Sequence, residues 1–126
     1  MSLLTTSSIL LAVVAISSSA LSYEQAKSNA DRDERSLSPA QTQQLLASQG
    51  KAGGEAHASC LQPESKSDMS AYTVVMELDS SGKVARTWLK GASPLATCFN
   101  KEMATKSLFA PPHAPFYTSF EMSWRP

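Results

Sequence analysis

The chain has 126 residues, of which 42% are hydrophobic and 17% charged, and its 11 basic and 11 acidic side chains give a formal net charge of zero. This length suffices for one domain but not for two. A chain without net positive charge has no long-range field to attract nucleic acids or anionic membrane surfaces, which argues against binding to either.

The first 22 residues contain no charged side chain and include an apolar run, Ile9–Ile16. The small residues Ala20 and Ser22 follow this run, as a signal peptidase requires. The pattern predicts a secretory signal peptide over residues 1–22, cleaved near Ser22, and a periplasmic or secreted mature chain. An uncleaved membrane anchor is the alternative, but a span needs about 20 mainly apolar residues and serines and threonines interrupt this segment.

Residues 23–37 contain charges of both signs and almost no large apolar side chain. A segment of this composition buries too little apolar surface to fold, so we expect a flexible, solvated N-terminal arm. The remaining residues, 38–126, are predicted to form a single α+β domain.

The domain is expected to begin with a helix at Ser38-Pro39-Ala40-Gln41, which combines an N-cap serine, a first-turn proline and a glutamine three residues after the serine. This helix should extend to about Ser48. Three glycines between Gly50 and Gly54 should then interrupt it, because each costs about 1 kcal/mol in a helix interior. A second helical piece, Glu55–Leu61, is predicted to carry Cys60 onto the core.

A β-hairpin is expected next. Large apolar residues occupy every second position of Tyr72–Leu78, which is the signature of a strand. Asp79–Gly82 supplies the turn, and Val84–Lys90 forms the returning strand. Val84 and Leu89 have opposite parity, so a bulge near Arg86 or Thr87 is needed if both face the core.

A helix from Pro94 to about Lys106 follows, started by Ser93. Its expected buried stripe consists of Leu95, Cys98, Phe99 and Met103. Three prolines, Pro111, Pro112 and Pro115, then hold an extended connection. Alternating side chains over Phe116–Trp124 predict the last strand.

The direction of each element predicts the topology. The last strand is antiparallel to the first, and pairing between them places the most apolar strand, Tyr72–Leu78, in the centre. We therefore expect an αββαβ fold of the α+β class. Its three-stranded antiparallel sheet has the order second, first, last, and helices cover one face.

Two cysteines, Cys60 and Cys98, lie in the segment predicted to be exported, where an oxidising compartment lets them pair. We expect a disulfide, which should stabilise the fold by about 4 kcal/mol by closing the loop between them. The alternative is a metal site of His57, Cys60, Cys98 and His113. No recognisable ligand spacing joins the second pair, which favours the disulfide.

Together, a helix ending in a cysteine, VVMELDSSGKV at 74–84, a Ser-Pro helix with a second cysteine and FAPP at 109–112 resemble the TonB C-terminal domain superfamily. The closer resemblance is to its AgmX-type branch, found in gliding-motility proteins, and it covers about Ser38 to Trp124. The resemblance implies a periplasmic domain that holds protein partners; in TonB it pairs with an extended peptide of an outer-membrane transporter. TonB transducers also have a membrane helix and a long proline-rich spacer, whereas about 15 residues separate the predicted signal from the first helix here. A free-standing periplasmic module is therefore expected.

The two predicted edge strands differ in charge. Lys83, Arg86 and Lys90 on the second strand discourage pairing, whereas the last strand carries only one charge and is a template for strand addition. We predict that the last strand docks an extended segment of another envelope protein or of a second copy. The residues of this docking edge are Phe116, Tyr117, Thr118, Ser119, Phe120, Glu121 and Met122. Alternatively, a loop or the N-terminal arm covers the edge, or its aromatic side chains belong only to the core.

Catalytic motifs are not recognisable. His57 and His113 are expected to be polar surface residues, and Asp79 fits a hairpin turn better than it fits chemistry. The sequence contains no nucleophile elbow, phosphate loop or paired carboxylates at a fixed spacing. We predict a protein that is not an enzyme and needs no cofactor. The second functional hypothesis is a small secreted inhibitor or ligand-binding protein whose loop, Ser107–Pro115, inserts into a target.

Overall fold

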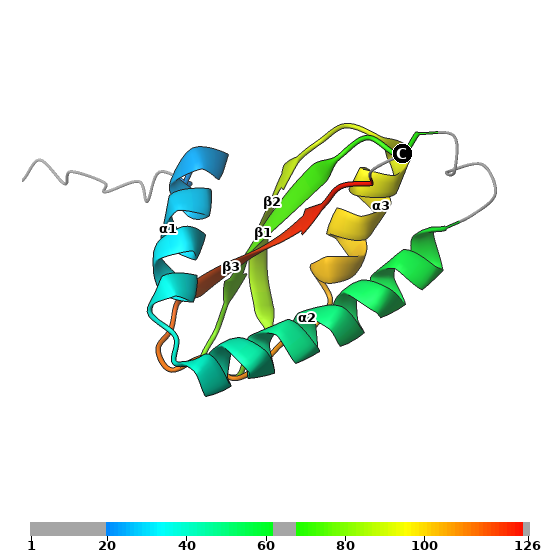
Figure 1. Cartoon of the computed structure of the whole chain (residues 1–126). Helices are drawn as coiled ribbons and strands as arrows, with labels where there is room; N and C mark the ends of the chain where they lie inside the picture. Colours follow the sequence, from blue (N-terminus) through cyan, green and yellow to red (C-terminus); the bar gives the residue numbers. More distant parts are fainter. Residues whose placement is uncertain (1–19, 62–67, 125–126) are drawn as a thin grey trace, which may run out of the picture.

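A computed structural model describes residues 20–61 and 68–124 (Figure 1). The elements in chain order are α1 (Tyr23–Arg35), α2 (Pro39–Cys60), β1 (Tyr72–Leu78), β2 (Val84–Lys90), α3 (Pro94–Met103) and β3 (Phe116–Met122). The strands form one antiparallel sheet in the order β2-β1-β3. The predicted α+β class and strand order are confirmed.

The sheet has helices on both faces. Side chains at alternate positions of β1, including Val74, Met76 and Leu78, pack with α2 and α3 in the main core. Val75 points to the opposite face, where it packs with Tyr117 and α1. The expected helical cover is therefore present, and α1 adds a layer on the second face.

The α1 helix corrects the prediction of a flexible arm at 23–37. Ser22 caps this helix through a capping box with Gln25, and Ala26 and Ala30 are fully buried against the sheet. Alanines four residues apart lie on one helical face and let the helix approach closely. The large side chains of this contact come from the sheet. The scarcity of large apolar residues in 23–37 therefore led to the wrong prediction that this segment does not fold.

The α2 helix is continuous from Pro39 to Cys60, which corrects the predicted break at its glycines. Gly50 and Gly54 are exposed, whereas Gly53 is buried beneath the ring of Phe120. A Cβ at position 53 would lie 2.6 Å from Phe120 Cε2. Close packing of α2 on the sheet therefore outweighs the low helix propensity of glycine.

The hairpin of β1 and β2 is confirmed, but its bulge lies at a different residue from the one predicted. Glu77 pairs with Arg86 and Leu78 pairs with Val84, so Ala85 is the extra residue of a bulge. The bulge thus lies just before the predicted Arg86 or Thr87. In the turn, Gly82 has φ of 91°, and Asp79 Oδ1 accepts backbone hydrogen bonds from Ser81 and Lys83, as expected for a turn residue.

Two predicted elements end early. The α3 helix stops at Met103 rather than Lys106, because the chain turns to pair with the start of β2. There, Val84 N donates to Lys106 O at 3.0 Å. β3 stops at Met122 rather than Trp124, because Met122 pairs with the first residue of β1.

Candidate functional site

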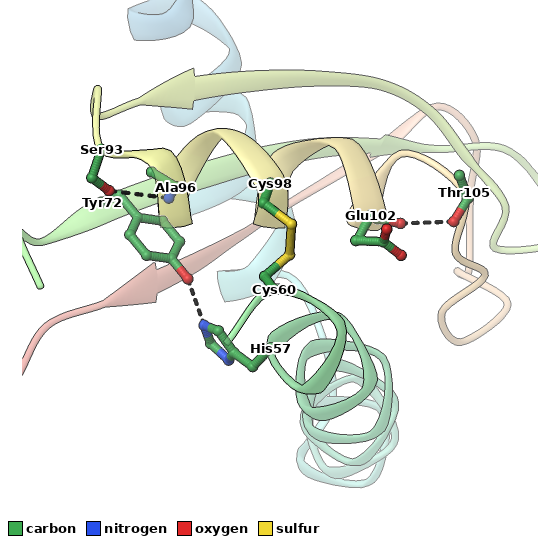
Figure 2. Close-up of a disulfide and its surroundings, with 8 residues drawn as sticks. All are labelled: His57, Cys60, Tyr72, Ser93, Ala96, Cys98, Glu102 and Thr105. Atoms are coloured by element: carbon green, nitrogen blue, oxygen red, sulfur yellow. Dashed lines mark hydrogen bonds between the residues drawn. A yellow bond between two sulfur atoms is a disulfide. The ribbon is translucent and has the colours of Figure 1, made fainter. Parts of the chain in front are cut away.

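The disulfide joins the end of α2 to the middle of α3 (Figure 2). The Sγ atoms of Cys60 and Cys98 are 2.05 Å apart, and their Cα atoms are 5.8 Å apart. This confirms the predicted pairing and contradicts the alternative metal site, because both thiols are used in the bond. Nowhere in residues 20–61 and 68–124 do three or more His, Cys, Asp or Glu side chains gather as metal ligands would.

His57 lies beside the disulfide but bonds to a tyrosine. Its Nε2 is within hydrogen-bond distance of the Tyr72 hydroxyl (Figure 2). The centre of its ring lies 4.5 Å from that of Phe99, with the two rings tilted. Burial lowers the pKa of His57 and raises that of Tyr72, so the neutral forms of both are favoured. The hydrogen bond to Tyr72 and the contact with Phe99 thus fix the His57 side chain against the core.

The predicted docking edge on β3 is largely covered. Phe116, Tyr117 and Thr118 are buried, Ser119, Phe120 and Met122 are half-buried, and only Glu121 is exposed. Phe116 and Phe120 face the main core, and Tyr117 faces α1. Most side chains of this edge therefore serve the packing of the domain.

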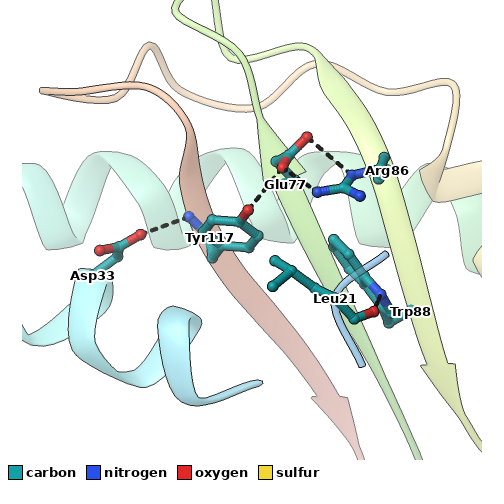
Figure 3. A network of polar contacts seen from close by, with 6 residues as sticks. All are labelled: Leu21, Asp33, Glu77, Arg86, Trp88 and Tyr117. Carbon is teal, nitrogen blue, oxygen red and sulfur yellow. Dashed lines mark hydrogen bonds and ion pairs between the residues drawn. The ribbon is translucent and has the colours of Figure 1, made fainter. Parts of the chain in front are cut away.

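Side chains from α1 and α2 also bond to the outward backbone groups of β3. Asp33, which is 3% exposed, accepts a hydrogen bond from Tyr117 N at 2.9 Å (Figure 3). Gln49 Nε2 donates to Ser119 O at 3.2 Å and to Thr118 Oγ1 at 2.8 Å. These bonds occupy groups that an added strand would need, which agrees with the alternative that the N-terminal segment covers this edge.

A second carboxylate of α1 lies at the same edge. Burial raises the pKa of Glu34, although the positive charge of Lys27 and hydrogen bonds with Thr118 and Ser119 counteract this effect. Lys27 also forms an ion pair with Glu121 at 3.1 Å. The C-terminal half of α1 therefore places two acidic groups against β3 where the sequence had suggested free backbone.

The other edge of the sheet is open. Tyr117 N on β3 points away from β1, toward Asp33. Along an antiparallel strand, the backbone groups of successive residues point alternately toward and away from the neighbouring strand. Followed through the register from β3 to β1 and from β1 to β2, this alternation directs the backbone N–H and C=O groups of Thr87 and Leu89 away from β1. Neither residue has a hydrogen-bond partner for these groups in the described part of the chain. Residues 106–108 cover only the start of β2. The open edge is thus the stretch 85–90.

Charged and aromatic side chains flank the open edge on the α1 face (Figure 3). Arg86 donates to Glu77 at 2.9 Å and lies 4.9 Å from the ring centre of Trp88. Tyr117 donates its hydroxyl proton to the same Glu77 at 2.8 Å. These hydrogen bonds lower the pKa of Glu77, so it stays ionised and holds the guanidinium of Arg86 in place.

Lys83 and Lys90 are exposed at the two ends of β2. The ammonium group of Lys90 lies 5.7 Å from the ring centre of Tyr23. With Arg86, they give the open edge three cationic side chains, and β2 itself contains no acidic residue. From the sequence alone, these charges predict only that this edge resists unwanted strand pairing.

The loop Ser107–Pro115, proposed as an inhibitory insertion, is partly built into the core. Leu108 and Phe109 are buried, and Phe109 N donates to Ser48 Oγ on α2 at 3.1 Å. The exposed portion begins at Ala110, and His113 within it lies 3.5 Å from Asp33. This loop is therefore anchored at Leu108 and Phe109 and again through His113, although residues 110 and 112–115 are exposed.

Comparisons with family models, with curated proteins and with solved structures find no match to this chain. Among the helices that the structure describes, none combines the length and the apolar character needed to cross a membrane.

Proposed function

We propose that this chain is an exported protein-interaction module, held by one disulfide, that binds an extended segment of another envelope protein by strand addition. The resemblance to the TonB C-terminal superfamily supports this class of function. In this proposal the docking strand is β2, whereas the sequence had suggested β3.

The observation that carries the proposal is the pair of outward-facing residues Thr87 and Leu89, whose outward backbone groups bond to none of the residues that the structure describes. Each presents a backbone donor and a backbone acceptor along an edge, which is what an added strand requires. Both residues are half-buried, so a partner strand would contact the exposed parts of their side chains as well as the backbone. β3 offers less, because Asp33 and Gln49 already bond there.

Charge selects the kind of segment. Lys83, Arg86 and Lys90 would repel the same edge of a second copy, so pairing of β2 with β2 is disfavoured. A segment with acidic side chains on the face turned toward α1 would meet Arg86 and Lys90 with complementary charge. The partner that fits is therefore an extended acidic segment of a different protein.

A peptide-binding assay on the disulfide-bonded protein tests the proposal. The probes are a heptapeptide of alternating Glu and Val and a matched heptapeptide of alternating Lys and Val. We expect the acidic peptide to bind, and Thr87→Pro to abolish binding because proline removes the outward N–H. Thr87→Ala keeps this N–H and should retain binding. Equal binding of both peptides, or binding unaffected by Thr87→Pro, contradicts the proposal.

Capture from an envelope fraction then separates this function from the inhibitor hypothesis. Recovery of transport or motility components through the β2 edge supports the interaction module. Recovery of a hydrolase, lost on deletion of residues 110–115 and not with Thr87→Pro, would support insertion of the loop Ser107–Pro115 instead.

A further inference from the structure

The junction before α1 allows two cleavage points on sequence grounds. Signal peptidases need small residues at the last and third-last positions before the cut. A cut after Ala20 places Ser18 and Ala20 there, and a cut after Ser22 places Ala20 and Ser22 there. Both cuts satisfy the requirement, so the sequence does not choose between them.

Leu21 belongs to the folded domain. Its carbonyl oxygen accepts a hydrogen bond from Trp88 Nε1 at 2.7 Å (Figure 3). Its side chain packs against the cluster formed by α1 and the sheet, which includes Val75. A chain without Leu21 loses this packing and leaves the indole N–H of Trp88 without its protein acceptor.

Ser22 has an equally specific role as the N-cap of α1. Its Oγ accepts from Gln25 N at 3.1 Å, and its own backbone N–H donates to Gln25 Oε1 at 3.0 Å. A cut after Ser22 would remove both bonds of this capping box. It would also place a new ammonium group on Tyr23, the first residue of the helix, where the helix dipole disfavours positive charge.

The bond before Leu21 has no comparable role. Ala20 is exposed, and neither Ala20 nor the backbone N of Leu21 takes part in a hydrogen bond within the described ranges. Breaking the Ala20–Leu21 bond therefore costs the domain none of the contacts seen there.

We infer that the processing site is the Ala20–Leu21 peptide bond and that the mature chain begins with Leu21. A membrane-bound signal peptidase hydrolyses this bond with one water molecule. Ala20 receives the new carboxylate and Leu21 the new α-amino group. The inference depends on the export assumed in the proposed function and moves the cut two residues upstream of the Ser22 position expected from the sequence.

The test is secretory expression of the full 126-residue sequence, followed by N-terminal sequencing and intact mass measurement of the exported protein. We expect Leu21 as the first residue. Ser18→Phe puts a large side chain at the third-last position of this cut and should block it. Ser22→Phe would block the alternative cut, and should leave cleavage before Leu21 unchanged.

A chain beginning at Tyr23, or an exported chain that is not cut, would overturn the inference while leaving strand addition intact. Retention of the whole chain in the cytoplasm would overturn the export that both proposals assume. As a second readout, refolded chains beginning at Leu21 and at Tyr23 can be compared. The first should have the higher melting temperature, and Trp88→Phe should lower that of the first more than that of the second. Equal melting temperatures with equal effects of Trp88→Phe would count against the inference.

Discussion

Asp33 shows how one side chain decides which edge of the sheet is available. It is almost fully buried at the C-terminal end of α1, and its carboxylate bonds to the backbone of Tyr117 on β3. The sequence 31–35 appeared to be a solvated charge cluster. Only the packing of α1 on the sheet reveals that one of these acids faces inward, and residue spacing alone does not indicate its distant partner.

Replacing Asp33 with alanine should lower the free energy of unfolding by about 1–3 kcal/mol, because it leaves the buried N–H of Tyr117 unbonded. Chemical denaturation measures this loss. Asp31→Ala is the matched control, since Asp31 makes an ion pair with Lys27 near the surface, and it should cost about 0.5 kcal/mol or less. Equal losses for the two variants would contradict the role assigned to Asp33.

His57 gives the fold a pH dependence of defined sign. Burial holds its folded-state pKa below the ordinary 6.5, so the folded protein binds fewer protons than the unfolded chain in this range. The stabilisation is complete above pH 6.5 and is lost as the pH falls toward the lowered pKa. Thermal unfolding of the native protein should therefore show a decreasing melting temperature from pH 7 to pH 5.

His57→Gln removes the titrating group and should flatten this part of the curve. His113→Gln should leave the decrease in place. His113 lies in the exposed loop, where it contacts Asp33 and Phe116 and none of the partners of His57. A curve that flattens with His113→Gln and not with His57→Gln would contradict this assignment.

At the scale of elements, local sequence signals predicted the hairpin, the Ser-Pro helix starts and β3. They failed for α1, whose contact with the sheet is made by alanines. They also failed for the centre of α2, where a glycine packs against the sheet. A small side chain is informative only when the surface opposite is known, and that surface is distant in the sequence. Gly53 illustrates this, because its partner Phe120 is on β3.

Two glycines of α2 provide a matched test of this explanation. Gly54→Ala meets no atom within 4 Å, so it should raise the free energy of unfolding by about 1 kcal/mol through helix propensity. Gly53→Ala collides with the Phe120 ring, which is held by His57 and Phe99, and should lower it by roughly 1–3 kcal/mol. Denaturation of both variants measures the difference, and equal stabilisation would show that α2 is not tightly packed at this point.

The disulfide holds α2 and α3 together across one face of the sheet. The double variant Cys60→Ser, Cys98→Ser should lose about 4 kcal/mol, because the unfolded chain regains the freedom of a loop between residues 38 apart. Urea unfolding in the presence and absence of reductant checks this value, and reductant should affect only the native protein. A loss below about 1 kcal/mol would show that packing, not the bond, positions α3.

At the scale of the whole molecule, the accessibility of the two sheet edges is the reverse of what their charges predicted. Side chains of α1 and α2 cover the nearly uncharged β3. The cationic β2 has outward backbone groups that bond to nothing within residues 20–61 and 68–124. The strand order could be predicted because it follows from apolar alternation, and the disulfide because the two cysteines lie in a segment predicted to be exported. The availability of an edge could not, because it depends on which neighbouring element reaches it.

Amide hydrogen exchange measured residue by residue tests this account most directly. In the free protein, we predict fast exchange at Thr87 and Leu89, and slow exchange at Trp88 and Tyr117. Addition of the alternating Glu and Val heptapeptide should slow exchange at Thr87 and Leu89 alone among these four. Slow exchange at Thr87 and Leu89 before the peptide is added, or protection by the peptide at Ser119 and Glu121 instead, would contradict it.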